Sequence, residues 1–357
     1  MRAAVLTSLN KDLEIIDLII PELKRGQVLV DIKASGICGA QLNQKKGIKI
    51  KKEFLPCLMG HEGSGIVEKV GKDVSKVKPG DKVVLHWRPG GGIESDFPQY
   101  ESKIGKVGSG LVTTFSEYSI ISENRITKVN SDFDFAKLSL FGCAITTGMG
   151  IIDNEIDLNP NDSIAIYGTG GVGLNVLIAA KLKKANPIIA IDQSDTKLKK
   201  AKSFGATHTI NTKDNPDLEG ELKLILGGYP KFNIETTGNI NLIKSSYEFL
   251  MSGGTSVLVG QPKNNEDLVF KNFVNNFIGK TLLDTSGGNI NPDKDIQNYI
   301  DLYTKENIDL NNLIFDYYSL DEINNAFNTI EKSKDFFGRG VILFDWQNFS
   351  YWWFLYR

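Results

Sequence analysis

The run IAIYGTGGVGLNVLIAAKL (residues 164–182) constrains the fold more than any other part of the chain. An apolar strand pattern leads into three glycines spaced G-x-G-x-x-G, and a helix pattern follows at once. In such a turn the first glycine permits the tight bend, the second lets the backbone approach a pyrophosphate, and the third lets helix and strand pack closely. Free N–H groups at the helix start would then face the phosphates. The pattern predicts a dinucleotide-binding loop formed by Gly168, Gly170, Gly171, Val172 and Gly173.

A glycine-rich turn in any α/β protein could imitate this pattern, so the flanking sequence has to support it. The next strand pattern, PIIAID, ends in Asp192, nineteen residues after Gly173. An acid about 20 residues past the glycines accepts the adenosine ribose hydroxyls, and it repels a 2′-phosphate. Gln193 offers no positive charge to such a phosphate, which favours NAD over NADP. From about residue 161 strand and helix patterns alternate, as is typical of a doubly wound parallel sheet.

The first third of the chain has a different texture. QVLVDIKASGI alternates like a strand, and GSGIVEKVG and KPGDKVVL indicate further strands separated by glycine and proline turns. After Gly288 the sequence becomes mixed and includes an amphipathic helix pattern, LDEINNAFNTIEK. With 357 residues the chain is long enough for two domains. We therefore expect an α/β protein with a mostly β domain beside the parallel-sheet domain.

Charge and composition exclude several classes of protein. The net charge is −2, from 41 basic and 43 acidic side chains that are interspersed, whereas nucleic-acid and membrane-surface proteins need a basic excess. No apolar run approaches the roughly 20 residues that span a bilayer. The N-terminus lacks a signal-peptide core, so we expect a cytoplasmic protein. Three cysteines are too few and too scattered for a disulfide framework.

Three scattered residues are candidates for a metal site: Cys38 in GICGAQ, His61 in MGHEGSG and Cys143 in LFGCAITTG. A lone buried cysteine usually serves as a small core side chain. Two cysteines and one histidine together, however, are a known ligand set for a catalytic zinc with one open position. Cys57 is interpreted as a packed core thiol. The remaining histidines are His86, which follows a strand, and His208, for which we expect no role.

The motifs GICGAQ, GHEGSGIVEKVG, FGCAITTG and GTGGVGL, in this order, resemble the zinc-containing alcohol dehydrogenases of the medium-chain dehydrogenase/reductase family. The resemblance covers nearly all of residues 1–344. It implies a GroES-like, mostly β catalytic domain over 1–145 and 287–344, and an NAD-binding Rossmann domain over 146–286. The aromatic segment 345–357 stands apart, and no role is assigned to it.

The resemblance also implies roles for individual residues. Cys38, His61 and Cys143 would bind the catalytic zinc, and Glu62 would lie behind the metal and tune or exchange its coordination. Arg339 in FGRGVILF would bind the pyrophosphate, and Lys197 would reach the adenosine ribose. Trp87 stands where relatives place a pocket-lining aromatic side chain. Many relatives hold a second, structural zinc with four clustered cysteines, but residues 86–115 contain no cysteine, so we expect only one zinc.

Three of the residues that follow Cys38, namely Ala40, Gln41 and Asn43, depart from the family pattern. Ala40 replaces a Ser or Thr hydroxyl that receives the substrate proton, and Asn43 stands near a position often held by His. Gln41 replaces an Asp that orients the zinc-binding histidine, so it can accept a hydrogen bond but brings no charge. Proton release would then run through water, Thr147 or the cofactor ribose.

The resulting hypothesis is a zinc- and NAD-dependent oxidoreductase that transfers hydride between a primary or secondary alcohol and NAD, forming the aldehyde or ketone. A sugar, polyol or cyclitol dehydrogenase on the same fold is an alternative. A zinc-free quinone-type reductase and a non-catalytic nucleotide-binding protein are two others. The partners expected are a small alcohol or carbonyl substrate and further copies of the chain in a homodimer or homotetramer, with neither nucleic acid nor membrane.

Overall fold

The computed structural model describes residues 1–344 except 49, 264, 271–273 and 275–277, and the aromatic segment 345–357 lies outside the described residues. The chain divides into two compact units. Among the described residues, the first comprises Met1–Cys143, Asn291–Lys332 and 339–344, and the second comprises Ala144–Ile290 and Ser333–Gly338. The return of Ser333–Gly338 to the second unit has no counterpart among the domain limits expected from the sequence.

The first unit combines a closed barrel with a separate sheet. In the part of the chain that the structure describes, the barrel has the order β1-β2-β7-β8-β4, and the sheet has the order β10-β6-β5-β3-β18-β17, with β9 also pairing with β3. The barrel strands are β1 (Arg2–Leu6), β2 (Glu14–Ile19), β4 (Cys57–Leu58), β7 (Gln99–Ser102) and β8 (Gly105–Gly108). The sheet strands are β3 (Gln27–Ile37), β5 (Glu62–Val70), β6 (Lys82–His86), β9 (Tyr118–Ser122), β10 (Ile126–Lys128), β17 (Ile314–Tyr318) and β18 (Arg339–Leu343).

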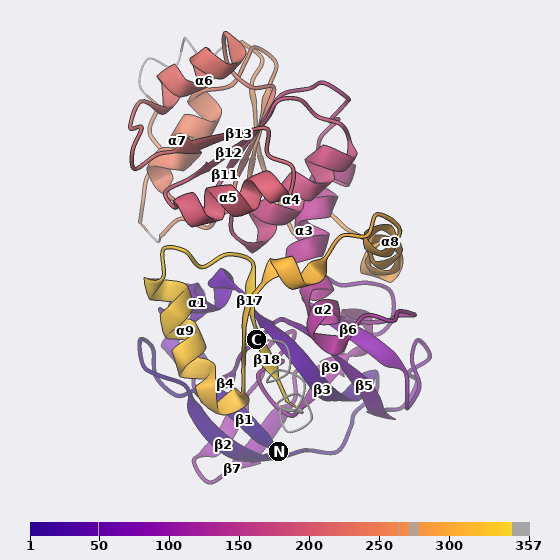
Figure 1. Ribbon diagram of the computed structural model, residues 1–357. Coiled ribbons are helices and arrows are strands. Elements are labelled where there is room, and N and C mark those ends of the chain that lie inside the picture. The colour runs from indigo at the N-terminus through magenta and orange to yellow at the C-terminus, as the bar shows by residue number, and fades with distance from the viewer. Residues whose placement is uncertain (49, 264, 271–273, 275–277, 345–357) are drawn as a thin grey trace, which may run out of the picture. The chain divides into compact units, whose positions relative to one another are not determined.

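Helices and short helical turns of the first unit connect these strands (Figure 1). They are α1 (Gly39–Lys45), η1 (Lys52–Phe54), η2 (Glu123–Arg125), α2 (Phe135–Ser139), η3 (Leu140–Gly142), α8 (Pro292–Lys305), η6 (Leu310–Leu313), η7 (Leu320–Glu322) and α9 (Ile323–Lys332). The apolar face of α9 buries Ile323, Ala326 and Phe327 in one core cluster with Leu6 and Ile37. Burial of this kind contributes about 25 cal/mol per Å² of apolar surface.

A loop in the first unit, residues 87–98, lies within the segment 86–115 that contains no cysteine. The buried Glu123 holds it. One carboxylate oxygen accepts the backbone N–H groups of Ser75 (2.6 Å) and Lys76 (2.8 Å), and the other accepts that of Ile93 (2.9 Å). Asp293 accepts the N–H of Gly91 at 2.6 Å. Carboxylate–backbone hydrogen bonds therefore order this loop, since it contains no cysteine.

The second unit is built on a parallel sheet. Among the described residues the strand order is β13-β12-β11-β14-β15-β16, and every neighbouring pair is parallel. The chain order along the sheet therefore reverses between β11 and β14, where ligands bind in open α/β sheets. The prediction of a doubly wound sheet is confirmed. The strands are β11 (Ile164–Tyr167), β12 (Ile188–Asp192), β13 (His208–Asn211), β14 (Phe232–Glu235), β15 (Thr255–Leu258) and β16 (Thr281–Asp284).

Helices cover both faces of this sheet (Figure 1). Leu218 and Leu222 of α6 pack with Ala165, Tyr167 and Ile189 on one face of the sheet. The helical elements of the unit are α3 (Ala144–Gly150), the π-helical turn η4 (Ile151–Glu155), α4 (Gly171–Leu182), α5 (Asp195–Ser203), α6 (Leu218–Leu226) and α7 (Ile240–Glu248). No single helix in the described part of the chain is long and apolar enough to cross a membrane, and only Phe135–Gly142 taken together with Ala144–Glu155, across a 48° bend, meets that test.

Candidate active site

Three side chains of the first unit converge. One ligand atom from each of Cys38, His61 and Cys143 lies within 4.8 Å of the other two. Cys38 is the N-cap residue of α1, directly after β3. His61 directly precedes β5, and Cys143 directly follows η3. Residues far apart in sequence are therefore brought together at the ends of separate elements. The family resemblance implied this set of three, and their binding of zinc stays a prediction.

The donor set fits a zinc ion. Two thiols and an imidazole are the protein ligands of one known class of catalytic zinc site. Two sulfur atoms, each about 2.3 Å from a tetrahedral ion, stand roughly 3.8 Å apart. Separations of no more than 4.8 Å therefore need only a small contraction to hold the metal. Among the described residues, Cys38, His61 and Cys143 form the group of at least three histidine, cysteine or acidic side chains whose ligand atoms lie this close together.

A hydrogen bond between the two thiols shifts their pKa values in opposite directions. The Cys143 thiol donates to the Cys38 sulfur, and this hydrogen bond, with help from the charge of Arg339, holds the pKa of Cys38 well below its ordinary value although burial opposes the shift. The same hydrogen bond and burial raise the pKa of Cys143. Cys38 is therefore the more acidic thiol of the pair, and the thiolate is the form in which cysteine binds metal.

A buried ion pair adjoins the cluster. Arg339 Nε donates to Glu62 Oε1 at 2.6 Å, and its Nη2 donates to Cys38 Sγ at 3.3 Å. Glu62 is fully buried and Arg339 is 5% exposed. Burial alone would lower the pKa of Arg339, but the charge interactions with Cys38 and Glu62 outweigh it and raise the pKa above its ordinary value. Arg339 thus places a positive charge beside the Cys38 sulfur, a contact that the sequence did not indicate.

Glu62 and Arg339 form an ion pair with each other, whereas the family resemblance implied a metal ligand and a pyrophosphate ligand. Glu62 directs an oxygen to Arg339 and is not one of the three clustered ligands. Its exchange onto the metal stays a prediction, as does the binding of a pyrophosphate by Arg339. The pKa of the Glu62 carboxyl is raised, first by burial, so the ion pair with Arg339 is what keeps this carboxylate compatible with its position.

Gln41 connects the first turn of α1 to the histidine. Its Oε1 accepts the backbone N–H of Cys38 at 2.7 Å, and its Nε2 lies 2.6 Å from His61 Nδ1. The side chain is 1% exposed. Ala40 and Asn43 lie on the same helix, and neither side chain titrates.

The glycine-rich loop in the second unit has the geometry that its sequence predicts. Gly168 has φ +90°, and a Cβ there would meet Thr236 Oγ1 at 2.7 Å. A Cβ on Gly173 would stand 2.0 Å from the Gly168 carbonyl oxygen, so helix and strand pack too closely for a side chain. At Gly170 nothing lies within 4 Å of such a Cβ. The open side of the turn is therefore at the N-terminus of α4, where backbone N–H groups favour an anion.

Asp192 lies at the end of β12 and is hydrogen-bonded to this loop. One carboxylate oxygen accepts both the N–H and the hydroxyl of Thr169, each at 2.9 Å, and the other accepts the N–H of Gln193 at 2.8 Å. Lys197 lies in the first turn of α5, whose N-cap is Ser194. Thr147 is buried in α3 of the second unit. The predicted ribose contacts of Asp192 and Lys197 and the proton-transfer role of Thr147 stay predictions.

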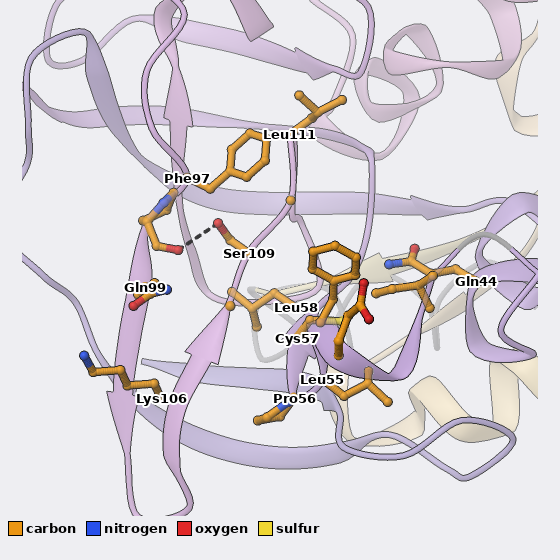
Figure 2. Close-up of a pocket in the computed structure, with 16 residues that line it drawn as sticks. Gln44, Leu55, Pro56, Cys57, Leu58, Phe97, Gln99, Lys106, Ser109 and Leu111 are labelled. Carbon is orange, nitrogen blue, oxygen red and sulfur yellow. Dashed lines mark hydrogen bonds between the residues drawn. The ribbon is translucent and has the colours of Figure 1, made fainter.

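A cavity of about 550 Å³ lies in the first unit, between the segment around β4 and the β7–β8 hairpin (Figure 2). Phe54, Phe97 and Leu111 line it and are 61%, 51% and 44% exposed. Trp87 is not among its lining residues, and its contact with substrate stays a prediction. Cys57 also lines the cavity, and burial raises its pKa to about 11. The polar lining residues are Gln44, Glu53, Gln99, Lys106 and Ser109.

Sequence reasoning missed this cavity, although apolar side chains in otherwise polar turns, such as Phe97 in GIESDFPQ, were a usable signal. The other two histidines are structural in character. His86 is buried between the Thr127 hydroxyl (2.9 Å) and the Arg88 carbonyl (2.7 Å), and burial lowers its pKa to about 4. His208 lies at the start of β13.

A cluster of two cysteines and a histidine in one unit and a glycine-rich turn of the dinucleotide-binding type in the other are typical of metal-dependent dehydrogenases. Comparison with known proteins agrees. The family model for the alcohol dehydrogenase GroES-like domain matches residues 24–131, and the model for the zinc-binding dehydrogenase matches residues 171–305. An S-(hydroxymethyl)glutathione dehydrogenase of Escherichia coli is 30% identical over 93% of this chain and 97% of its own length.

Two solved structures are similar over almost the whole chain. The benzyl alcohol dehydrogenase of Acinetobacter calcoaceticus is 30% identical, with a TM-score of 0.85 over 96% of this chain and 99% of that one. An alcohol dehydrogenase zinc-binding domain protein of Burkholderia ambifaria is 26% identical, with a TM-score of 0.87 over 96% and 98%. The chain belongs to the zinc-containing alcohol dehydrogenases of the medium-chain dehydrogenase/reductase family, and the predictions of a GroES-like domain and a Rossmann domain are confirmed.

Proposed function

We propose that this oxidoreductase interconverts alcohols that carry an apolar or aromatic body and their carbonyl products, with one zinc ion per chain and with NAD. The observation that carries the substrate class is the cavity of Figure 2. Its walls include Gln44 of α1, the helix that Cys38 caps, and the segment 54–58, which ends three residues before His61. The cavity is therefore lined by residues that follow Cys38 and precede His61 closely in the chain, although Cys38, His61 and Cys143 are not among its lining residues.

Cys38, His61 and Cys143 would hold the metal and leave its fourth position open. Zinc in such a site acts as a Lewis acid that makes an alcohol hydroxyl more acidic and polarises a carbonyl. The positive charge of Arg339 offsets the negative charge of the buried Glu62 next to Cys38. Phe54, Phe97 and Leu111 would hold the body of the substrate by apolar and ring contacts. Because Ala40 and Asn43 carry no titratable group, the proton leaves by another route than a relay on α1.

The choice of NAD is supported by Asp192. Its carboxylate already accepts hydrogen bonds from the glycine-rich loop, so it stays ordered at the end of β12 where an adenosine ribose would bind. A 2′-phosphate in that place would meet a negative charge without a compensating cation from Gln193. NAD, when bound, would supply the acceptor for the hydride.

A polyol or sugar substrate is the second candidate, because Gln44, Gln99 and Ser109 bring hydrogen-bonding groups to the same cavity. The homodimeric or homotetrameric state and the cytoplasmic location are further parts of the proposal. Size-exclusion chromatography with light scattering measures the first, and cell fractionation measures the second.

A substrate panel with NAD and NADP tests the function. It contains ethanol, benzyl alcohol, sorbitol, myo-inositol and S-(hydroxymethyl)glutathione. We expect kcat/KM for benzyl alcohol to exceed that for the two polyols at least tenfold. Replacing Phe97 by Ala should raise KM for benzyl alcohol about tenfold, since loss of a ring contact in the cavity costs on the order of 1–2 kcal/mol. Leu224→Ala, on an 81% exposed residue of α6, is the matched control. A preference for polyols would overturn the substrate class.

A further inference from the structure

The carboxamide of Gln41 makes two hydrogen-bonded contacts, one as an acceptor and one as a donor. The amide group has one oxygen, which only accepts, and one nitrogen, which only donates. The oxygen faces the N–H of Cys38 at 2.7 Å, and the nitrogen faces His61 Nδ1 at 2.6 Å. The residue is buried, and the structure shows both groups at hydrogen-bonding distance.

This arrangement determines where the hydrogen of the histidine ring must be. Because Gln41 Nε2 donates, His61 Nδ1 has to accept, and the neutral ring then carries its hydrogen on Nε2. Nε2 is also the nitrogen left for a metal, since Nδ1 is taken up by Gln41. A histidine that binds metal through one nitrogen normally donates the N–H of its other nitrogen to an acceptor. With metal on Nε2, two N–H groups would face each other across 2.6 Å.

We propose that Gln41 is a positioning residue whose carboxamide turns over when His61 binds metal, so that metal binding competes with the capping of α1. After the turn, Oε1 accepts the hydrogen of His61 Nδ1, and Nε2 faces the N–H of Cys38, which loses its acceptor. A carboxylate would satisfy both N–H groups at once. The inference rests on the metal centre of the proposed function. It implies that this centre binds zinc more weakly than the same ligands would with an acid at position 41.

Zinc affinity measured by competition with a chromophoric chelator tests the proposal. Gln41→Glu keeps the shape of the side chain and supplies two acceptors, and it should tighten zinc binding about 10–100-fold, the usual effect of a partner behind a metal-binding histidine. The control is Asn43→Asp, which adds the same charge to the same helix at a position other than the one that contacts His61. It should change the affinity less than threefold. Equal effects of the two variants would mean that charge alone acts, and would overturn the proposal.

Imidazole ¹⁵N NMR of the unaltered chain provides a second readout that does not depend on a variant. The chain has only three histidines, so the His61 signals can be assigned. Without zinc the ring hydrogen should lie on Nε2, and with zinc it should move to Nδ1. A zinc-free ring with its hydrogen on Nδ1 overturns the role of Gln41 and leaves the metal centre intact. His61 signals that do not respond to zinc overturn both.

Discussion

The nucleotide loop of the second unit and the metal centre of the first are built in opposite ways. The glycines of the loop and Asp192 lie within one short stretch of chain, residues 168–193, and the loop works largely through backbone geometry: a left-handed glycine, a close helix–strand contact and an open helix N-terminus. The metal centre joins four separate segments by side chains, at Cys38, His61, Cys143 and Arg339. A site formed by backbone groups should keep its geometry when nearby side chains are substituted. A site formed by side chains should lose its geometry when one of those side chains is replaced.

The largest effect is expected from a ligand of the metal centre. Cys143→Ala removes one of three protein ligands, so zinc content should fall from about one per chain to near zero and turnover should fall to background. Elemental analysis and circular dichroism separate metal loss from unfolding. Cys57→Ala is the matched control for zinc content, since Cys57 is a buried thiol outside the cluster. Retention of a full zinc equivalent by the Cys143 variant would contradict the ligand set.

A smaller effect is expected in the nucleotide loop. Asp192→Ala should raise KM for NAD about 10–100-fold, because a hydrogen bond to a charged group contributes about 1.5–3 kcal/mol, and it should narrow the preference for NAD over NADP. Asp195→Ala, three residues along the chain at the start of α5, should leave both KM values unchanged. If the unaltered chain already prefers NADP, the interpretation of Asp192 is wrong.

The next prediction concerns the loop 87–98, which like the nucleotide loop depends on backbone N–H groups. Glu123→Gln removes an acceptor from the cluster of N–H groups, so the free energy of unfolding should fall by about 1–3 kcal/mol in chemical denaturation. Glu101→Gln, on an exposed strand position, should change it by less than about 0.5 kcal/mol.

The pH dependence of that loss has a definite sign. Burial alone would raise the pKa of Glu123, but hydrogen bonds from Ser75, Ile93 and Lys76 outweigh it and lower the pKa below the ordinary value. A carboxyl whose pKa is lowered by folding stabilises the protein above its unfolded-state pKa, and that contribution is lost as the pH falls through the folded-state pKa. The difference between the unaltered chain and Glu123→Gln should therefore be largest at neutral pH. A difference that grows on acidification would contradict this account.

The smallest effect is expected from restoring a hydroxyl in the metal centre. Ala40→Ser should raise kcat on ethanol severalfold and sharpen its pH profile, because a positioned proton acceptor assists the chemical step. Gly39→Ser, one residue earlier on an exposed position, controls for the added hydroxyl. If Ala40→Ser gains nothing and the unaltered chain is already fast on short alcohols, another group carries the proton.

The two regions also differ in how far the sequence predicts them. The nucleotide loop follows from local spacing, because one turn and one strand end contain all its determinants. The three candidate metal ligands were proposed only through the resemblance to a family, since spacing cannot show that positions 38, 61 and 143 meet. The place of Arg339 could not be predicted at all. It follows from the pairing of β18 with β3, in which Gly340 lies opposite Ile37, and such a pairing across 300 positions leaves no local pattern.

The carboxylate of Glu123 has a consequence for how the protein meets a shortage of metal. Glu123 and Asp293 accept backbone N–H groups of the loop 87–98, and Arg125 pairs with Glu94 in it, so we expect the loop to keep its order when zinc is removed. A strong chelator should then abolish turnover while the amides of Ser75, Lys76 and Ile93 keep their protection from hydrogen exchange. The emptied chain would persist as a folded reserve that regains activity when zinc returns, without a round of refolding or resynthesis.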